Sequence, residues 1–459
     1  MQMDIVNKLI TQRNFFDTGI TKEYNFRKEQ LQKLQAVVKK NELGIFEALH
    51  TDLKKSPEEC WITENGFFLS ELSNAISNLG KWMRPKRTST NLTNLPSKSF
   101  IMPEPLGVVL IISPWNYPFQ LLFTPLIGAM AAGNCVVLKS SEFAPATSAI
   151  MKKMIAQTFD EKYILFTDGD GATVISAMMD NFVFDHVFYT GSTAVGKIIY
   201  QAAAKNLVPV TLELGGKSPC VVEEEVDIKI AAKRIALPKF SNAGQMCVAP
   251  DYVLVHASQK EALLAELKKT ITGFFKGNAA ASYDYGKIIN EKQFDRLVTY
   301  FKDGNILFGG KTDRTALFIE PTLMDNINPD GPIMKDEIFG PILPIISFTK
   351  MEEALAIINK NKNPLAFYIF TSNSQKEKQW LQAVAFGGGC VNNASVHLLN
   401  HHLPFGGRGT SGLGQYHGRF SFDTFSHKKG VIKTPAWIDP SMKYPPYAGR
   451  LSFLKKLIG

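Results

Sequence analysis

Residues 105–138 read PLGVVLIISPWNYPFQLLFTPLIGAMAAGNCVVL and contain no charged side chain. A stretch of this length is long enough to cross a bilayer. The prolines at positions 114, 118 and 125 would interrupt a lipid-exposed helix repeatedly, which argues against a membrane span. The run from Gly107 to Ser113 is rich in Val and Ile, as is typical of a strand buried on both faces. A helix over 119–132 that ends at Gly133, followed by a buried strand over 135–138, would complete a βαβ unit and hence a parallel sheet.

The same alternation continues downstream. It predicts a helix over 147–159, strands over 163–167 and 185–189, and a helix over 194–204. Alternating strands and helices predict an α/β fold with a covered, doubly wound sheet. Ligands of such sheets bind beyond the carboxyl ends of the strands, where Lys139, Gly191 and Ser192 fall. The first part of the chain is therefore predicted to bind a nucleotide.

The segment from Gly191 to Lys197, GSTAVGK, matches a phosphate-binding P-loop as far as its lysine. Ile198 stands where a P-loop has the hydroxyl that binds magnesium, which argues against a nucleoside triphosphatase. A glycine turn that opens a helix still presents free N–H groups and a positive dipole end to an anion such as pyrophosphate. A tight turn with Ser192 as a simple helix cap explains the same residues, so the local sequence leaves both interpretations open.

A thiol and a carboxylate suited to acyl chemistry occur further along the chain. Cys247 ends the pentad AGQMC, and Glu213 opens the word ELGGK. A thiolate that adds to a carbonyl carbon, and a carboxylate that activates water to hydrolyse the adduct, are the groups that aldehyde oxidation through a thioester requires. Taken singly, Cys247 is also compatible with an ordinary core cysteine, and Glu213 with a charge at the end of a strand.

Composition limits the class of protein. A chain of 459 residues with 45% hydrophobic content predicts two or three globular domains. Five scattered cysteines without paired spacing argue against a disulfide framework and indicate a reducing compartment. The net charge of +9 is spread among acidic residues and no nucleic-acid module is legible, so no nucleic-acid partner is expected. Asp4, Lys8 and Arg13 interrupt the N-terminal segment, which therefore lacks the apolar stretch of a signal peptide and favours a cytoplasmic location.

Five short sequence motifs occur in an order and with a spacing that resemble those of the aldehyde dehydrogenase superfamily. They are residues 188–192 (FYTGS), 213–217 (ELGGK), 243–247 (AGQMC), 336–341 (DEIFGP) and 403–407 (LPFGG). The resemblance covers nearly the whole chain. The segments 244–252 and 444–447 look like the class 3 branch, which handles fatty and aromatic aldehydes. The resemblance implies an α/β fold with a doubly wound nucleotide-binding domain, an α/β catalytic domain and a β oligomerisation arm.

The resemblance also implies a domain map. Residues 1–212 would form the nucleotide-binding domain, with a projecting arm segment near 88–105 that includes a strand over 98–105. Residues 213–385 would form the catalytic domain that carries the nucleophilic cysteine. Residues 386–459 would return to the first domain and supply the arm and a C-terminal tail, and such a tail accompanies homodimers in class 3 relatives. Leu451, Leu454, Leu457 and Ile458 have helical spacing beside basic residues, so the tail is expected to pack on its own subunit, cover the substrate mouth or touch a membrane surface.

By resemblance, Cys247 is the nucleophile, Glu213 activates water, and the amide of Asn116 stabilises the oxyanion. The cofactor is NAD or NADP: Glu142 disfavours the 2′-phosphate of NADP, although class 3 relatives often accept both. The residues implied to contact it are Lys139, Glu142, Gly191, Ser192, Gly196, Leu214, Glu337 and Phe339. Two other functions stay open, a CoA-acylating aldehyde dehydrogenase and a catalytically silent binding protein. Glu213 favours hydrolysis, because the acylating relatives characteristically lack it.

Several residues depart from this pattern or compete with it. Cys390, which follows three glycines, is the nearest rival to Cys247 as the reactive thiol. The histidine cluster at positions 397, 401 and 402 lacks nearby carboxylate or thiol ligands, so no metal is expected. Ser140 stands where the family more often has proline. Arg408 replaces a small apolar residue beside the glycine-rich loop that lines the substrate tunnel in the family, and is expected to reshape the entrance.

Overall fold

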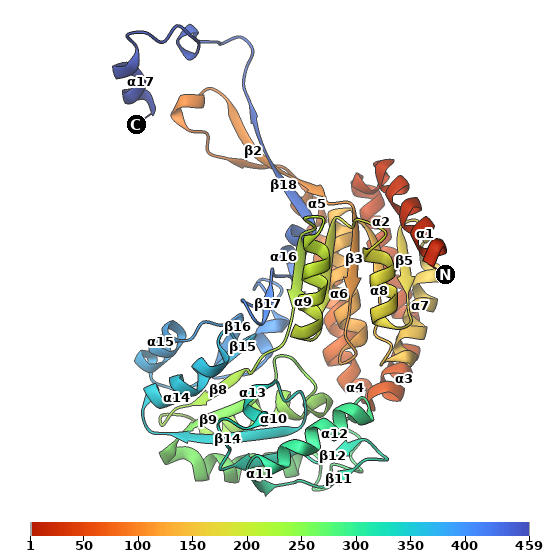
Figure 1. Cartoon of the computed structure of the whole chain (residues 1–459), viewed down its shortest axis with the longest axis vertical. Helices are drawn as coiled ribbons and strands as arrows, with labels where there is room; N and C mark the ends of the chain where they lie inside the picture. Colours follow the sequence, from red (N-terminus) through yellow and green to blue (C-terminus); the bar gives the residue numbers. More distant parts are fainter. Residues whose placement is uncertain (1, 459) are drawn as a thin grey trace.

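The computed structural model describes residues 2–458, and it consists of two α/β layers and a projecting arm (Figure 1). The first layer contains a sheet in the order β17-β7-β6-β3-β4-β5, parallel except for the short β17. Its strands are β3 (Val108–Ile112), β4 (Cys135–Lys139), β5 (Ile164–Thr167), β6 (His186–Thr190), β7 (Val210–Glu213) and β17 (Gly412–Leu413). The strand order reverses direction between β3 and β6, so the sheet is doubly wound, as predicted.

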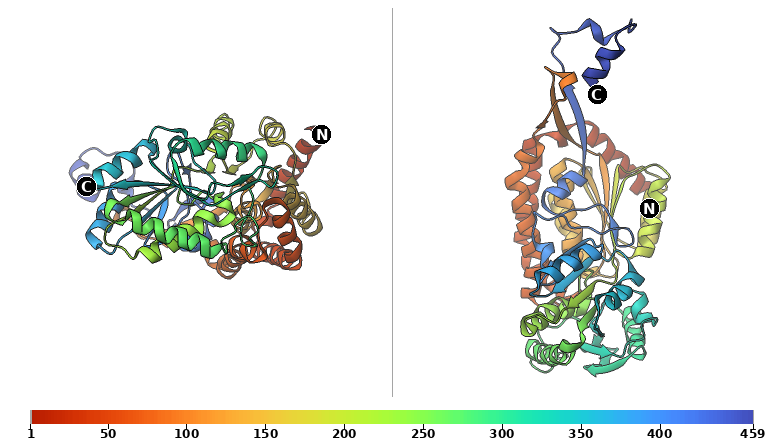
Figure 2. Two further views of the ribbon diagram at one scale, coloured as in Figure 1. Left: turned by 90° about the horizontal axis from the view of Figure 1, so that it is seen from below. Right: turned by 90° about the vertical axis from the view of Figure 1, so that its left-hand side faces the viewer.

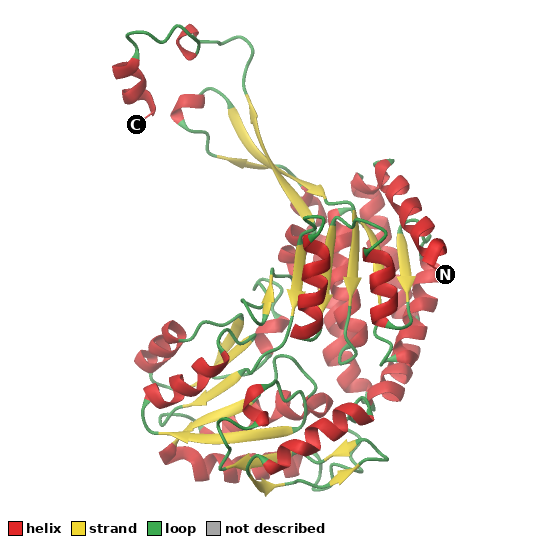
Figure 3. Ribbon diagram, in the orientation of Figure 1, coloured by secondary structure: helices red, strands yellow, loops and turns green. Residues whose placement is uncertain are grey.

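Helices cover both faces of this sheet (Figure 3). Those between its strands are α6 (Pro118–Ala132), α7 (Pro145–Thr158), α8 (Gly171–Met179) and α9 (Thr193–Ala204). The strands and helices predicted for this region are confirmed to within a few residues, whereas α8 was not predicted. The N-terminal helices lie beside this layer (Figure 2), and the longer ones are α1 (Gln2–Asp17), α2 (Tyr24–Lys40), α3 (Glu42–Leu53) and α5 (Gly66–Met83).

The helix α6 is buried along its whole length. Its first turn donates two backbone N–H groups to Glu64 Oε2, from Phe119 at 3.1 Å and from Gln120 at 3.0 Å. Gly133 ends it in the left-handed conformation at φ 95°, and Arg27 donates to the carbonyl of Ala131 at 3.1 Å. Opposite charges at the two ends of a helix offset its macrodipole, which matters most where water is excluded. No helix among residues 2–458 is long and apolar enough to cross a membrane.

The second layer is a sheet in the order β10-β13-β14-β9-β8-β15-β16, parallel except for the edge strand β10. Its strands are β8 (Pro219–Val222), β9 (Tyr252–His256), β10 (Asn305–Phe308), β13 (Thr322–Asp325), β14 (Ile342–Phe348), β15 (Ala366–Phe370) and β16 (Gly388–Val391). Its longer helices are α10 (Ile228–Phe240), α11 (Lys260–Phe274), α12 (Glu291–Thr299), α14 (Met351–Ile358) and α15 (Ser374–Ala383). The strand β16 lies beyond residue 385, where the sequence placed the end of the catalytic domain, yet it belongs to this sheet.

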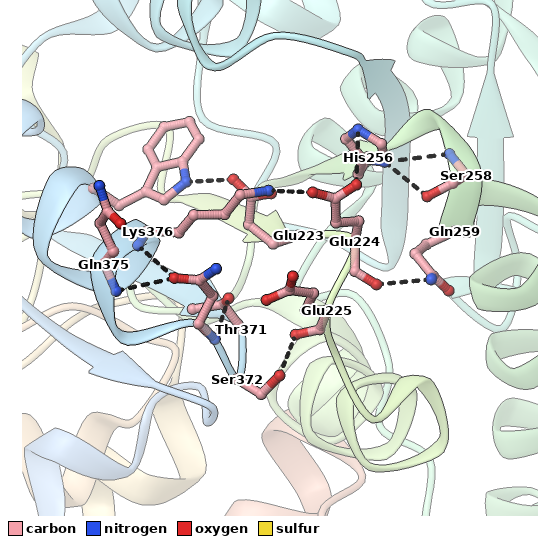
Figure 4. Close-up of polar contacts among 12 residues, drawn as sticks. Glu223, Glu224, Glu225, His256, Ser258, Gln259, Thr371, Ser372, Gln375 and Lys376 are labelled. Carbon is pink, nitrogen blue, oxygen red and sulfur yellow. Dashed lines mark hydrogen bonds and ion pairs between the residues drawn. The ribbon is translucent and has the colours of Figure 1, made fainter.

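A polar network stabilises the carboxyl edge of the second sheet (Figure 4). Glu223, directly after β8, is buried and accepts hydrogen bonds from Trp380 Nε1 at 2.7 Å and from Lys376 Nζ at 2.8 Å. Lys376 also pairs with Glu224 at 2.7 Å. Because both donors lie on α15, these contacts fix that helix to the end of β8.

The arm is a three-stranded antiparallel sheet that projects away from both layers (Figures 1 and 2). It contains β1 (Lys86–Thr88), β2 (Lys98–Pro105) and β18 (Ser426–Lys433). The bounds of β2 are those that the sequence predicted for a projecting strand. The tail helix α17 (Leu451–Ile458) lies beyond the tip of the arm, with Leu451 and Phe453 exposed. The expectation that the tail packs on the body of its own subunit is therefore wrong, because the arm carries it away from both layers.

Replacing Gly133 by alanine should destabilise the protein by roughly 1–2 kcal/mol, the usual cost of a left-handed non-glycine residue. The added Cβ would also lie 2.6 Å from the Arg27 guanidinium. Thermal melting followed by circular dichroism measures the loss. Gly273→Ala is the matched control, since that helical glycine has open space around it and its melting temperature should hold or rise. Equal melting temperatures for the two variants would contradict the role given to Gly133.

Candidate active site

The carboxyl edge of the first sheet brings several predicted site residues together. In the register, Ile112 of β3 lies opposite Lys139 of β4 and Tyr189 of β6, and Thr190 lies opposite Glu213. Parallel strands end at one edge, so Asn116, Lys139, Gly191 and Glu213 all follow or end strands there. This is the edge at which doubly wound sheets bind ligands.

Cys247 lies on a loop that enters this edge from the second layer. The loop follows α10 through a turn in which Asn242, Ala243 and Gly244 all have positive φ, at 48°, 49° and 74°. A Cβ on Gly244 would overlap the carbonyl oxygen of Gly340, so only glycine permits the close approach of these two segments. The turn reverses the chain after α10 and leaves Cys247 partly buried at the cavity wall.

Buried hydrogen bonds fix the cysteine loop against the turn after β3. Asn116 Nδ2 donates to the carbonyl of Gln245 at 3.0 Å, and Asn242 Nδ2 donates to the carbonyl of Asn116 at 2.8 Å. The side chain of Gln245 donates to Lys287 O at 2.9 Å and accepts from Ile289 N at 3.0 Å. Sequence reasoning missed Asn242 and Gln245, although both stand in or beside the AGQMC word.

Cys247 and Glu213 line one cavity of about 480 Å³. Its wall is mainly apolar and aromatic, with Phe67, Tyr117, Leu121, Leu214, Phe240, Met246, Val248, Phe274, Phe275, Phe405 and Tyr416. Carboxylates occur at only a few positions of the lining, among them Glu58, Glu59 and Asp284. The nucleophile and the base that the sequence predicted thus face the same space. Asn116 is not among the residues that line this cavity, and its amide nitrogen contacts the cysteine loop at the carbonyl of Gln245.

Glu213 has no hydrogen-bond partner on either carboxylate oxygen among the described residues, although it is only 2% exposed. Burial raises its pKa well above the usual range, because a charged carboxylate there has lost its water. A carboxylate with a raised pKa is a stronger base. An orphaned, buried carboxylate on a cavity wall is suited to accept a proton from a molecule inside the cavity.

Burial also raises the pKa of the Cys247 thiol, and the carboxylates of Glu337 and Glu213 add to the rise. Negative charge nearby disfavours the thiolate. Without a ligand the thiol is therefore protonated near neutral pH. The pKa of Glu337 is raised to about 8, mainly by burial and then by the charge of Asp251.

Glu337 and Phe339 lie on a segment next to the two motifs that contain Glu213 and Cys247. A Cβ on Gly215 would overlap the carboxylate of Glu337, so the two are in direct contact only because residue 215 is glycine. Phe339 has φ 51° and its ring meets that of Trp115 edge-on, with centroids 5.3 Å apart. A second cavity of about 530 Å³ adjoins this segment, lined by Thr193, Gly215, Gly216, Lys217, Lys335, Asp336, Glu337, residues 359–364 and Thr410.

The remaining predicted cofactor residues surround the first turn of α9 and the end of β4. Ser192 caps α9 by accepting from Val195 N at 3.4 Å. Lys139 lies 3.6 Å from Glu142, which accepts from Gly171 N at 3.1 Å. A Cβ on Gly191 would overlap the hydroxyl of Tyr189. The structure thus has a glycine turn and a capping serine at the N-terminus of a helix, an arrangement that presents backbone N–H groups to an anion.

Some predicted site residues lie differently from expectation. Leu214 lines the first cavity and packs near Gly196, not in the second cavity. Arg408 is exposed and is not among the residues that line either cavity, and its backbone N–H donates to Ser411 Oγ at 2.8 Å; its effect on the entrance stays a prediction. Ser140 is buried, with its hydroxyl 2.7 Å from that of Ser148.

The competing thiol and the histidines lie apart from the catalytic pair. Cys390 lies 3.6 Å from His397 Nδ1 and does not line the first cavity. His397 stacks on Phe405, whereas His401 and His402 pair with each other. Within residues 2–458 no group of three potential metal ligands lies close enough to hold an ion.

Comparison with known proteins agrees with this geometry. Residues 19–431 match the aldehyde dehydrogenase family. A 4,4′-diaponeurosporen-aldehyde dehydrogenase of Staphylococcus aureus is 46% identical over 453 residues, which cover 98% of each chain. The aldehyde dehydrogenase family 3 member H1 of Arabidopsis thaliana is 42% identical and covers 98% of this chain and 94% of its own. A solved structure described as the substrate-bound state of Staphylococcus aureus AldH superposes with a TM-score of 0.97 at 46% identity over 99% of both chains.

The chain belongs to the aldehyde dehydrogenase family, whose enzymes oxidise aldehydes with NAD or NADP. Within that family it is similar to the class 3 branch, as its relative from Arabidopsis thaliana shows. The predictions of family, α/β fold and reaction class are therefore confirmed.

Alkylation of Cys247 by iodoacetamide in the cofactor-free protein should be slow at pH 7 and should rise with pH. Glu337→Gln removes a negative charge that is present above about pH 8, and thus lowers the thiol pKa. At pH 9 the variant should react roughly threefold to tenfold faster, because each unit of pKa changes the thiolate fraction tenfold. Peptide mass spectrometry measures the rate, with Cys390 as internal control. Equal rates at pH 9 would contradict this coupling.

Proposed function

We propose that this chain oxidises a long, apolar aldehyde to its carboxylic acid through a thioester on Cys247, with NAD or NADP as the hydride acceptor. The observation that carries the proposal is that Cys247 and Glu213 face one apolar cavity, while Gly215 and Gly216 face a second, polar cavity. In this proposal the first sheet layer, residues 1–212, binds the cofactor. The second layer, whose first strand along the chain is β8, carries the nucleophile, and Glu213 ends β7 of the first layer.

The reaction begins at the thiol. Cys247 Sγ, as a thiolate, forms a bond to the aldehyde carbon, and the carbonyl electron pair moves to oxygen. The backbone N–H of Cys247 and the amide of Asn116 stabilise this oxyanion. Asn116 has one N–H on Gln245 O, which keeps its amide against the cysteine loop, and an amide nitrogen carries a second hydrogen. Preorganised donors in a dry site are the strongest means of holding such a charge.

The cofactor site follows the residues that fit a dinucleotide. The N-terminus of α9 with Gly191, Ser192 and Gly196 would hold the pyrophosphate, Lys139 and Glu142 the adenosine ribose, and Glu337 and Phe339 the nicotinamide ribose. When bound, NAD or NADP supplies a hydride acceptor. The short approach of Glu337 to Gly215 brings this segment next to the word that begins with Glu213.

Hydrolysis completes the cycle. Glu213 removes a proton from water, and the water oxygen forms a bond to the thioester carbon. The C–S bond of the adduct then breaks, which returns the Cys247 thiolate and releases the carboxylic acid. The two oxygens of Glu213 have no competing donor among the described residues. This placement favours water over CoA as the acceptor of the acyl group.

Cys247→Ser should abolish NAD(P) reduction with aldehyde, because a hydroxyl in this buried site is a far poorer nucleophile. Glu213→Gln should retain one burst of reduced cofactor per site and lose steady-state turnover by at least roughly 100-fold. Absorbance at 340 nm in stopped flow records both phases. Addition of CoA should leave the product a free acid. Full turnover in either variant would refute the mechanism.

The substrate class follows from the cavity wall. Aromatic and aliphatic side chains line it, and those toward solvent are exposed, including Ile62, Leu237, Val396 and Leu399. A chain longer than the cavity would contact these residues as it leaves. The relative from Staphylococcus aureus is named for an isoprenoid aldehyde, which supports an extended apolar substrate.

The kcat/KM for straight-chain aldehydes should rise with length until the cavity is filled. Each buried methylene contributes about 0.8 kcal/mol, or roughly threefold to fourfold. An aldehyde of equal length with a terminal carboxylate should react at least about tenfold less well, since Glu58, Glu59 and Asp284 lie on the lining. Steady-state kinetics at 340 nm compare the two series. No length dependence from acetaldehyde to dodecanal would contradict an apolar substrate.

We further propose that the protein is a cytoplasmic homodimer. The support is the arm, whose exposed Leu92, Leu95, Ile432 and Trp437 are apolar surface that a second copy would cover. The five cysteines are all free thiols, as suits a reducing compartment. The basic, partly apolar α17 would add a weak contact with anionic membrane.

A further inference from the structure

A buried ion pair joins the segment of Glu213, the proposed base, to the segment of Cys247, the proposed nucleophile. Lys217 ends the ELGGK word, and Asp251 follows Cys247 on the same loop. Lys217 Nζ donates to Asp251 Oδ2, and the two side chains are 2% and 4% exposed. Asp251 N also donates to the carbonyl of Ser218 at 2.8 Å. The segments of Glu213 and Cys247 therefore cannot shift independently without breaking a charged contact away from water.

The same pair grips the segment of Glu337. Lys217 Nζ donates to the carbonyls of Ile333 at 2.7 Å and Asp336 at 3.0 Å. Asp251 Oδ1 accepts from Ile338 N at 2.9 Å. These bonds hold backbone on both sides of Glu337, and they leave its carboxylate against Gly215.

Arg296 on α12 holds the segment from the other side. Its guanidinium donates to the carbonyls of Ile338 at 2.8 Å and Glu337 at 3.3 Å. Gln293 Oε1 and the hydroxyl of Tyr300 accept from it at 2.8 Å each, which fixes its plane. Arg296 contacts the Glu337 segment alone, and has no bond to the loops of Cys247 or Glu213 among the described residues.

We propose that Lys217, Asp251 and Arg296 are positioning residues with two separable tasks. The Lys217–Asp251 pair orders all three segments and with them the distance between the nucleophile and the base, whereas Arg296 acts only on the segment of Glu337 and sets that carboxylate for the nicotinamide ribose. This inference rests on the proposed function and names the residues that order its three segments. A displacement of about 1 Å at a reacting centre can cost about 100-fold in rate, so contacts of this kind are functional even at a distance from the chemistry.

The two tasks separate in two reactions of one protein. In the proposed mechanism, hydrolysis of p-nitrophenyl acetate would use Cys247 and Glu213 without cofactor, whereas aldehyde oxidation would use both residues and the cofactor. Arg296→Gln should raise the KM for NAD and the dissociation constant of NADH at least fivefold. At pH 7, below the Glu337 pKa of about 8, it should leave ester hydrolysis within twofold of wild type, because Glu337 there carries little charge to act on the thiol. NADH fluorescence titration gives the dissociation constant without turnover. Arg314→Gln is the matched control, because Arg314 makes exposed ion pairs with the same helix at Glu291 and Asp295 and should change neither reaction.

Asp251→Glu keeps the charge but lengthens the side chain, and should lower both reactions at least tenfold per titrated Cys247. Asp251→Asn keeps the shape of the side chain and the acceptor for Ile338 N. In protein that folds, it should lower the rates of ester hydrolysis and aldehyde oxidation less than Asp251→Glu does. Rates are normalised to the thiol titrated by burst, so loss of folded protein alone leaves the rate per site unchanged.

The inference is overturned if Arg296→Gln lowers both reactions in parallel, if it changes neither NADH binding nor oxidation, or if the Asp251 variants keep wild-type rates per site. If Asp251 variants yield no folded protein, the Arg296 comparison decides alone. Failure of the proposed function is a different result: wild type would then reduce neither NAD nor NADP with any aldehyde, while NADH titration of Arg296→Gln would still test the position of Glu337.

Discussion

The carbonyl oxygen of Asn116 is the point on which the site depends. It accepts from Lys55 Nζ at 3.1 Å and from Asn242 Nδ2 at 2.8 Å, and so joins the N-terminal helices, the turn after β3 and the cysteine loop. Lys55 pairs with Glu64 at 2.6 Å, with both side chains fully buried, and Glu64 in turn holds the first turn of α6. A buried pair that lost either member would leave an uncompensated charge, which typically costs about 3–5 kcal/mol. These linked contacts hold the thiol loop against the turn after β3.

Burial shapes the chemistry as much as the fold. Cys247, Glu213 and Glu337 all have raised pKa values for the same main reason, the loss of water around a charge. Each ionised carboxylate further disfavours the thiolate, so the site without ligand resists having several negative charges at once. The positively charged nicotinamide ring of an oxidised cofactor would favour thiolate formation when it enters the same space. The site without cofactor thus holds a thiol whose thiolate form is disfavoured.

The fold was readable because its signals are local. The uncharged stretch 105–138 shows period, turns and helix end together, and Gly133 adopts the left-handed conformation that its place after a helix predicts. That Cys247 and Glu213 share one site was also predictable, since the side-chain chemistry of their motifs and the order of the motifs along the chain both indicate it. The helix α8 was missed between two strands, where a short run of small and apolar residues gives little helical periodicity.

The sequence could not show how segments far apart in the chain are placed relative to one another in space. Nothing in the sequence of residues 451–458 shows that the arm carries the tail away from both layers, and nothing beside Arg408 shows that this residue is absent from the lining of both cavities. The glycine at position 244 is required by the close approach of Gly340, which lies far away in the sequence. Lys217 and Asp251 read as ordinary charges until the fold buries them together.

The arrangement of the two cavities explains why a single word, ELGGK, has so many tasks. Glu213 and Leu214 face the apolar cavity, whereas Gly215, Gly216 and Lys217 face the polar one, so this segment is the wall between them. An apolar aldehyde and a charged dinucleotide need opposite environments, yet they must meet at one carbon atom. A wall of two glycines is thin enough to let Glu337 contact the backbone from the polar side while Glu213 reaches the thiol side. Any side chain at Gly215 would push Glu337 away from the thiol, and the two environments would no longer meet where the chemistry requires it.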